Sequence, residues 1–310
     1  MSTERDPFDD LVFRHVSPRA KDVTSSNSNT PSNNSIGNTS RRSPPARRPP
    51  RVIVKLYIHE EVSSTQDKSE SIDEISSHVL LDGKVEASIT THHPLNPPFS
   101  MRISDPDYPE ETQNVFQFAS NLMTFYGPSE FNTLCVPKAM TQNYNKVKLA
   151  TYHRSVTKKF MPILVQVKVI RVGADGEFCR VAVQIRSNLN NAGSVGDIDI
   201  AMAVPPTVLS KTLSIVAGPG NGYFDEMKRV VRWKVKELEQ GSSVVFGAEC
   251  KVLPSLSPEE VPKFPLMLRC NSVEDTVSSL QIDCRQLDEE HPVNLAVSIN
   301  RSFQLLHRLP

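Results

Sequence analysis

The chain has 310 residues, of which 38% are hydrophobic, and its 35 Lys and Arg residues balance its 35 Asp and Glu residues. No apolar run approaches the roughly 18 residues that a membrane-spanning helix needs, and the N-terminal sequence has no apolar signal-peptide core. We therefore expect a cytosolic protein without a membrane-spanning helix. The five cysteines are widely spaced and form no C-x-x-C pair, which favours buried, reduced thiols over disulfides or a zinc site.

The first 51 residues form a basic segment ahead of a slightly acidic remainder. They contain nine Lys and Arg against five Asp and Glu, which leaves 26 basic and 30 acidic residues for the rest of the chain. Residues 24–40 have almost no apolar side chains, so they cannot bury enough surface to offset their ordering entropy. We expect residues 1–51 to be a disordered basic tail that carries short linear motifs, with an extended Arg/Pro run at 41–51.

One small apolar cluster interrupts this tail, at residues 6–13 (DPFDDLVF). A cluster of this kind in a disordered segment is typical of a short peptide that docks on another protein. Packing against its own domain is the alternative. In the docking interpretation, Asp6 and Pro7 set up a turn and Phe8 fills an apolar pocket.

From Val52 onward the patterns are those of β-strands. Residues 52–60 alternate apolar and polar side chains, and residues 78–89 predict a hairpin whose two-residue turn is Asp82-Gly83. Residues 113–127 are the one stretch with helical spacing, and Gly127-Pro128 would end that helix. Further strand patterns follow from residue 144 to the end of the chain.

The clearest strand pattern surrounds the only tryptophan. Val231, Trp233 and Val235 alternate with basic residues, and after a turn at 239–241 the alternation continues from Val244. Successive strand side chains point to opposite faces, so this predicts an antiparallel pair with one face on a core and one in water. Trp233 is expected to anchor that core, and a ligand platform is the alternative.

Nearly all regular structure is therefore expected to be β. The chain offers some fifteen strand patterns, whereas one open sheet rarely exceeds about ten strands. This predicts an all-β protein of two antiparallel sandwich subdomains.

The order of these segments resembles the mu homology domain of clathrin-adaptor medium chains. The similar segments are HVLLDGKVEASITTHHPLNPPFSMRISD, KLATYHRSVTKKFMPILVQVKVIRVG, RVAVQIRSN, DIDIAMAVP and RVVRWKVKELEQGSSVVFGAECKV. Within that superfamily, NVFQFASNLMTFY and YNKVKLATY are similar to the muniscin branch. The resemblance implies an elongated, all-β mu homology domain at 52–310. Subdomain A would comprise about 52–158 plus 271–310, and subdomain B about 159–270.

The sequence also departs from the pattern of cargo-reading medium chains. Their pocket for tyrosine-based peptides uses an Asp on the first strand and a Trp on a late strand. The matching first-strand region here contains Lys55 and His59, and the last strands contain no Trp. We therefore do not expect that pocket to operate.

The resemblance implies a non-enzymatic endocytic adaptor module at plasma-membrane clathrin-coated pits. It would bind endocytic scaffold and clathrin-adaptor proteins, with transmembrane cargo tails as further candidates. The alternative is a cargo-sorting adaptor subunit on internal membranes. No catalytic constellation, cofactor motif or nucleic-acid signature is found; GPGNG at 218–222 lacks the Lys-Ser/Thr of a phosphate-binding loop.

Two sets of site residues are predicted. Asp6, Pro7 and Phe8 form the tripeptide that appendage domains of clathrin adaptors read in accessory proteins. The second set consists of basic residues expected to bind anionic lipid or another anionic partner: Arg41, Arg42, Arg47, Arg48, Arg51, Lys146, Lys148, Lys158 and Lys159, with Arg154 in the same cluster. A solubilising surface is the alternative for the folded cluster, and recognition by PxxP-reading domains is the alternative for the Arg/Pro run.

Overall fold

The computed structural model describes residues 51–66, 78–91, 99–106, 116–119, 124–125, 133–135, 146–157, 161–218, 222–257, 259–286 and 294–310. Residues 50–310 form one compact unit. Several predicted features lie outside the described residues: the tail at 1–50 with Asp6, Pro7 and Phe8, the arginines Arg41, Arg42, Arg47 and Arg48, and the lysines Lys158 and Lys159.

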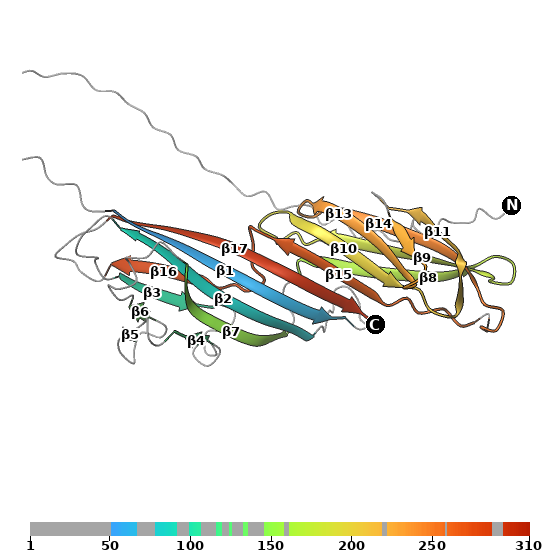
Figure 1. The fold of residues 1–310 in the computed structure, drawn as a ribbon, viewed down its shortest axis with the longest axis horizontal. Helices are drawn as coiled ribbons and strands as arrows, with labels where there is room; N and C mark the ends of the chain where they lie inside the picture. The colour runs from blue at the N-terminus through green and yellow to red at the C-terminus, as the bar shows by residue number, and fades with distance from the viewer. Residues whose placement is uncertain are drawn as a thin grey trace, which may run out of the picture. The chain divides into compact units, whose positions relative to one another are not determined.

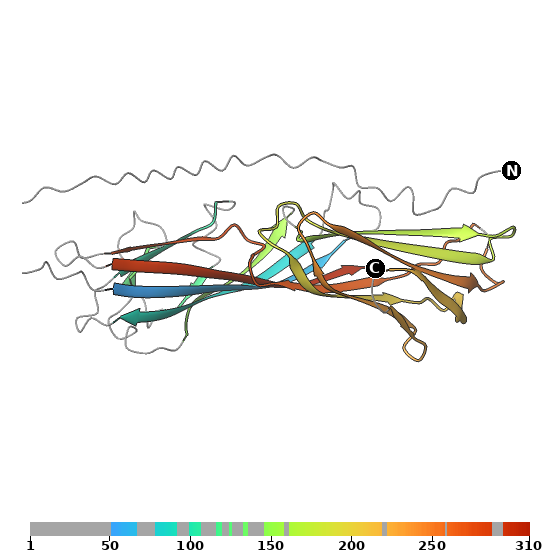
Figure 2. The ribbon, with the colours of Figure 1, turned by 90° about the horizontal axis from the view of Figure 1, so that it is seen from above.

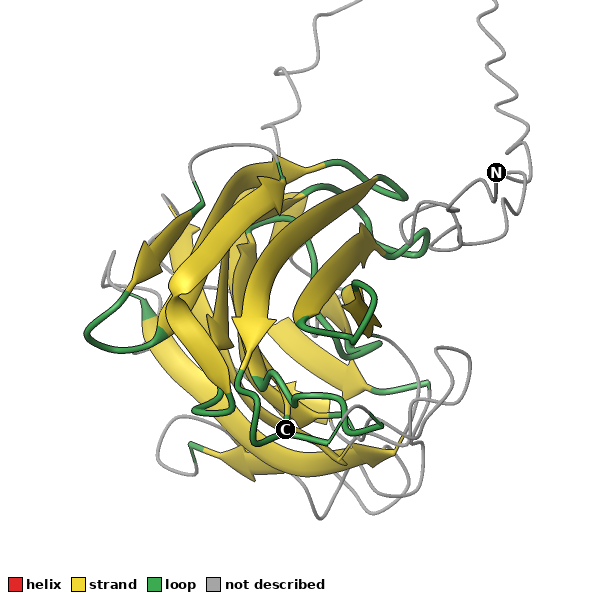
Figure 3. Cartoon of the chain, turned by 90° about the vertical axis from the view of Figure 1, so that its right-hand side faces the viewer, coloured by secondary structure: helices red, strands yellow, loops and turns green. Residues whose placement is uncertain are grey.

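Every regular element in the described ranges is a β-strand, and the strands form three sheets (Figures 1 and 3). The nine-stranded sheet has the order β12 (Tyr223–Asp225), β13 (Val230–Leu238), β10 (Val195–Ala203), β15 (Leu266–Ser272), β17 (Asn294–Leu309), β1 (Arg51–Thr65), β2 (His78–Thr91), β7 (Val147–Thr157) and β4 (Phe116–Phe118). The β8 sheet has the order β11 (Val208–Ala217), β14 (Ser243–Val252), β9 (Phe178–Ser187) and β8 (Ile163–Val172). The β3 sheet has the order β16 (Gln281–Gln286), β3 (Phe99–Ser104), β6 (Thr133–Cys135) and β5 (Thr124–Phe125). Among these residues no helix is long and apolar enough to cross a membrane.

The prediction of an all-β fold is confirmed, and one sheet serves both of the expected sandwiches. The β8 sheet lies against the part of the nine-stranded sheet that contains β10 and β13, and the β3 sheet lies beside β1 and β2 (Figure 2). The predicted boundary at 270–271 falls inside β15, which pairs with β10 on one side and β17 on the other. The division into subdomains A and B therefore remains a prediction.

Strands β1 and β17 depart from the expected antiparallel pattern. They run parallel from the pair Arg51 and Asn294 to the pair Thr65 and Arg308. β1 alternates as predicted, with Val52, Val54, Leu56 and Ile58 at most 1% exposed. Because β1 pairs with both β17 and β2, it lies in the interior of the nine-stranded sheet.

The expected pairing of the tryptophan strand with the strand that follows it is wrong. β13 pairs with β10 and β12, whereas β14 pairs with β9 and β11. The turn at 239–241 therefore carries the chain from one sheet to the other, and the two apolar faces meet across the core. Trp233 is 1% exposed and its ring centroid lies 5.5 Å from that of Phe246 in β14. Its role as a core anchor is confirmed.

The predicted hairpin turn at Asp82-Gly83 is also wrong, because β2 is one continuous strand of 14 residues. Gly83 lies opposite Glu60 in β1 and Tyr152 in β7. A Cβ atom at Gly83 would lie 2.0 Å from the Tyr152 ring. The glycine therefore allows a close approach of an aromatic ring and does not mark a turn.

The helix predicted at 113–127 is wrong in the residues that the structure describes. Phe116–Phe118 is strand β4 and Thr124–Phe125 is strand β5. The Phe116 ring packs on Tyr152 at 4.8 Å between centroids and stacks on Phe118 at 5.7 Å. Pairing with β7 and this aromatic cluster outweigh the helical spacing, as tertiary contacts often outweigh local propensity.

The cysteines are free, as expected, wherever their side chains are described. Cys179, Cys250 and Cys270 are buried, and Cys284 is half-buried. Burial raises the pKa of the Cys270 thiol well above its ordinary value. The buried thiols therefore contribute to the core, and that of Cys270 remains protonated at neutral pH.

Candidate functional site

Among the described residues, the N-terminal half of β17 forms a free strand edge. Residues 294–302 pair with β1 on one side, while β15 pairs only with residues 303–309 on the other. No described strand occupies the open side of 294–302. Unpaired strand edges present backbone amides and carbonyls to which another extended chain can bind.

Apolar side chains line this free edge on the core face of the sheet. Leu295 and Val297 lie opposite the buried Val52 and Val54 of β1, and Ile299 continues the row. Unlike their neighbours on β1, Val297 and Ile299 remain 40% and 36% exposed. The edge therefore offers a hydrogen-bonding ladder together with uncovered apolar contacts. We call residues 294–302 the β17 edge.

The β17 edge is anchored at its C-terminal end. Arg301 donates from Nη1 to Thr276 Oγ1 at 2.9 Å and from Nη2 to the Leu280 carbonyl at 2.7 Å. Asn300 Nδ2 donates to the carbonyl of Leu56 at 3.3 Å. These bonds fix the strand to β1 and to the segment before β16, so the edge is pre-formed.

Lys55 and His59 lie on the opposite face of the sheet from the exposed apolar row. Lys55 is exposed, and His59 Nδ1 lies 3.0 Å from Ser302 Oγ on the outer face. The only tryptophan is buried in β13. Any peptide at the β17 edge would therefore meet aliphatic side chains and not the Asp and Trp of a tyrosine pocket.

Four lysines gather on the outer face of β1, β2 and β7, and we call them the lysine face: Lys55, Lys84, Lys146 and Lys148. All four are exposed, and none forms an ion pair within the described residues. Lys146 Nζ lies 3.7 Å from the centroid of the Tyr57 ring, a cation–π geometry. Tyr57 lies opposite Glu86, and Glu86 lies opposite Lys148.

The lysine face changes the predicted basic cluster. Lys146 and Lys148 are on it, and Arg51 is exposed at the start of β1. Arg154 is not part of it, because its side chain is buried on the core face, where it forms an ion pair with Asp105. Lys55 and Lys84 belong to it as well, although neither was predicted to be part of the basic cluster. Their outward positions in alternating strands were visible, but their proximity depends on sheet pairing.

A buried polar network stands behind the lysine face. The carboxylate of Glu60 accepts hydrogen bonds from Tyr152 OH at 2.6 Å, the Val277 amide at 2.6 Å and the Ser278 amide at 3.0 Å. Burial, and after it the Glu60 charge, raises the pKa of Tyr152 well above its ordinary value. The network joins β1, β7 and the segment before β16, and so stabilises the scaffold of both surfaces.

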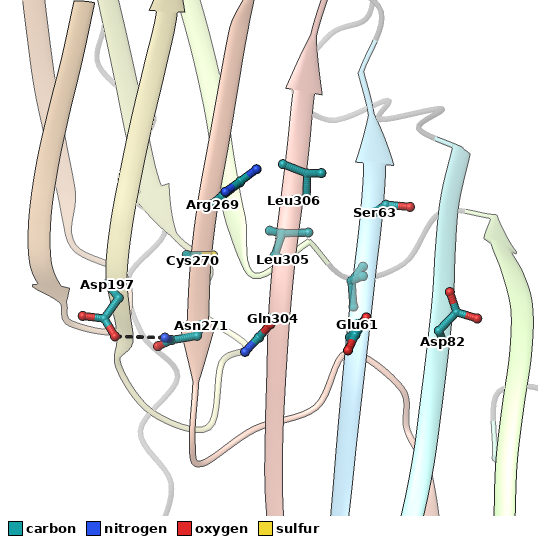
Figure 4. A pocket seen from close by; sticks show the side chains of 11 residues that line it. Glu61, Ser63, Asp82, Asp197, Arg269, Cys270, Asn271, Gln304, Leu305 and Leu306 are labelled. Carbon is teal, nitrogen blue, oxygen red and sulfur yellow. Dashed lines mark hydrogen bonds between the residues drawn. The ribbon is translucent and has the colours of Figure 1, made fainter.

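A groove of about 440 Å³ crosses the outer face of the nine-stranded sheet, near the C-terminal ends of β1 and β17 (Figure 4). Five strands contribute polar side chains to it: Asp82, Glu61, Ser63, Gln304, Asn271, Arg269 and Asp197. Asp197 has φ 48° and sits where the register of β10 and β15 shifts, and its carboxylate accepts a hydrogen bond from Asn271 Nδ2 at 3.0 Å. No local motif indicated this groove, since each of the five strands supplies at most three of its residues.

The groove is chemically suited to hydrogen-bond donors. It holds three carboxylates and one guanidinium, and Glu61 lies directly opposite Asp82. Like charges directly opposite one another are unfavourable in a sheet. No group of three or more His, Cys, Asp or Glu side chains with the arrangement of a metal site occurs in the described part of the chain.

This architecture of two sandwiches that share a parallel β1–β17 pair is the mu homology domain fold. Among solved structures, the chain is similar to the Fcho1 mu homology domain of Danio rerio with a bound Eps15 peptide. The TM-score is 0.58 at 14% identity, over 83% of this chain and 97% of that chain.

It is also similar to the yeast delta-COP-I mu-homology domain complexed with a Dsl1 WxWxV peptide. There the TM-score is 0.55 at 11% identity, over 83% of this chain and 98% of that chain. A second structure of the yeast delta-COP-I domain gives a TM-score of 0.54 at 10% identity, over 83% of this chain and 97% of that chain. No family model and no curated protein matches the sequence. The likeness establishes the fold.

Proposed function

We propose that this protein is a non-enzymatic adaptor module that binds extended peptide segments of coat or scaffold proteins at a membrane. The observation that carries this proposal is the β17 edge, a pre-formed free ladder lined by Val297 and Ile299. Such an edge binds an added strand through its backbone and discriminates partners through alternate side-chain positions. Nothing at this edge requires a catalytic group.

The comparisons support a peptide partner. Both the Fcho1 and the delta-COP-I domains are described with a bound peptide, from Eps15 and Dsl1 respectively. The muniscin-like sequences at 114–152 favour an endocytic adaptor at plasma-membrane clathrin-coated pits. The comparable likeness to delta-COP-I supports the second candidate, a cargo-sorting adaptor on internal membranes.

The same proposal assigns two further roles. The lysine face, with Arg51 and the arginines of the tail, would hold the module on anionic lipid, because each basic residue near such a surface contributes about 1 kcal/mol. Asp6, Pro7 and Phe8 would recruit a clathrin-adaptor appendage from the tail. Transmembrane cargo tails would be further ligands of the β17 edge.

Labelled Eps15 and Dsl1 WxWxV peptides are suitable probes for the β17 edge. Titrating each peptide with the full chain and following fluorescence anisotropy should give saturable binding of at least one of them. Val297→Glu should weaken that binding by more than about tenfold, since a carboxylate would replace an apolar contact worth 1.4 kcal/mol or more. Val216→Glu, at a 49% exposed position in β11, is the matched control and should bind normally.

Two results would overturn the assignment. The first is that neither peptide binds, and the second is that Val297→Glu and Val216→Glu weaken binding equally. Thermal unfolding of both variants should match that of the parent protein, because both positions are exposed.

A further inference from the structure

Most edges of the three sheets carry features that prevent further pairing. β12 and β4 have three residues each, and β5 has two. β16 alternates exposed Gln281, Asp283 and Arg285 along its six residues. The pairing of β11 with β14 is interrupted between Leu209 and Ser214. Short length, charge and irregularity are the usual ways in which proteins block edge-to-edge association.

Strand β8 has neither the short length nor the irregularity of these edges, and it carries fewer charges for its length than β16. Its ten residues, ILVQVKVIRV, pair with β9 without a register shift. Lys168 and Arg171 are its only charged residues, and it contains no proline. It is a long and regular edge strand of mostly apolar composition, the type that pairs readily with another chain.

The backbone groups that point away from β9 can be assigned from the ladder. The Asn188 amide donates to the Pro162 carbonyl at 2.9 Å, one pair ahead of β8. Hydrogen-bonded pairs in an antiparallel ladder recur every second residue, so the even-numbered residues of β8 bond to β9. The odd-numbered residues therefore direct their amides and carbonyls outward. In the described structure no backbone group pairs with those of Val165, Val167 or Val169.

The sequence of β8 is nearly symmetric about Val167. A two-fold axis at this residue in an antiparallel pair of β8 strands would place odd residues opposite odd residues, as outward hydrogen bonding requires. The resulting side-chain pairs are Val165 with Val169, Leu164 with Ile170, Gln166 with Lys168, and Ile163 with Arg171. Apolar side chains meet apolar ones at most positions, and no two like charges are opposed.

From this geometry we infer that β8 is a self-association surface, at which two copies of the chain join their β8 sheets into one eight-stranded sheet. The occupant of the edge is thus a second β8 strand related by a two-fold axis through Val167. Such an isologous contact closes on itself and does not propagate into a fibre. A strand-edge contact buries less than the about 800 Å² per partner of a standard interface, so the dimer is weak.

Sedimentation velocity of the full chain tests this surface. The weight-average mass should rise from monomer towards dimer between about 1 and about 100 µM, the range for a weak interface. Gln166→Lys places an ammonium group opposite Lys168 of the second copy and should weaken association at least about tenfold, through repulsion across the pair. Gln281→Lys, the same change on the exposed face of β16, is the matched control and should associate like the parent.

A second variant tests the backbone hydrogen bonds between the two β8 strands. Val167→Pro removes an outward amide that the ladder with β9 does not use, so the fold should persist with Trp233 still buried, while the central pair of intermolecular bonds is lost. Association should then fall to the level of Gln166→Lys or below. A monomer mass at every concentration, or a dimer that neither β8 variant weakens, overturns the inference.

Discussion

Gly83 shows how one residue can be misread when its neighbours in space are unknown. Asp-Gly between alternating apolar residues is a strong hairpin signal. In the structure the missing side chain makes room for Tyr152, whose hydroxyl then reaches Glu60 two strands away. The sequence contains no trace of this, because Gly83 and Tyr152 are brought together only by the pairing of β2 with β7.

Gly83→Ala should therefore destabilise the protein. The new methyl group would overlap the Tyr152 ring, which Phe116 and Glu60 hold in place. Overpacking of this kind costs about 1–3 kcal/mol. Urea unfolding followed by Trp233 fluorescence measures the loss.

Gly196→Ala is the control for Gly83→Ala. Its Cβ would lie 3.3 Å from Oδ1 of Asn271, a flexible side chain that can move. Equal losses for the two substitutions would show that the Tyr152 contact is not the cause.

His307 couples stability to pH. It is 1% exposed, with Ser64 Oγ at 2.7 Å and Gln66 Oε1 at 3.2 Å, and burial lowers its pKa from 6.5 to about 4. The unfolded chain therefore takes up this proton at a higher pH than the folded protein does. Stability from His307 is complete above pH 6.5, falls as pH drops below it, and is lost by about pH 4.

His307→Gln should remove this component of the pH dependence. The free energy of unfolding of the parent should fall between pH 7 and pH 4 by about 3 kcal/mol more than that of the variant, the equivalent of the shift in pKa. Denaturant titrations of the parent and the variant at pH 7 and pH 4 give the fall in the free energy of unfolding for each protein. A parent and a variant that decline in parallel would contradict the prediction.

At the scale of strands, the apolar and polar alternation of β1 and β13 was predicted correctly, but the predicted pairing of β13 with β14 was wrong. The inward positions of β1 and β13 were predicted from period-2 patterns, and Trp233 is buried as expected. The partners of β13 and β14 were wrong because an apolar face indicates only that a core lies opposite. It does not distinguish a neighbour in the same sheet from a strand in the facing sheet.

The helix at 113–127 failed for a related reason. Apolar residues spaced by three and four fit a helix, but Phe116 and Phe118 pair with β7, and Phe116 gains the contact with Tyr152 there. Long-range pairing decides between the two, and the chain from 113 to 127 holds no information about its partner. The β17 edge was hidden in the same way, since NLAVSIN resembles an ordinary core strand.

The lysine face belongs to the scale of strands, because β1, β2 and β7 each supply part of it. Changing Lys55, Lys84, Lys146 and Lys148 together to Ser should weaken binding to anionic liposomes by more than about tenfold at physiological salt, where screening acts over about 8 Å. Co-sedimentation with vesicles of defined anionic lipid content measures the effect.

Four exposed lysines elsewhere provide the comparison: Lys211, Lys228, Lys234 and Lys236. Their replacement by Ser changes the net charge equally and should reduce binding far less. If both sets act alike, general charge and not the lysine face attracts the membrane. If neither set of substitutions weakens liposome binding, the arginines of the tail would be the remaining source of lipid affinity. Replacing those arginines with Ser tests this.

At the scale of the molecule, the order of many degenerate segments was more informative than any one of them. It predicted the mu homology fold, which the solved structures share at 10–14% identity. The groove, the β17 edge and the β8 edge could not be foreseen, because each is defined by which strands do or do not lie beside it. Those relations appear only once the sheets are assembled.

The pairing of β1 with β17 has a consequence for how the protein is made. Partner residues on these two strands are 243 positions apart in the sequence. At about 5–20 residues per second, the ribosome needs about 10 to 50 s to complete β17 after β1 has emerged. During that interval β1 can pair with β2 but lacks its second neighbour, and the long-range closure makes folding slow. We therefore expect substitutions in β17 to act on yield in the cell more strongly than on the finished protein.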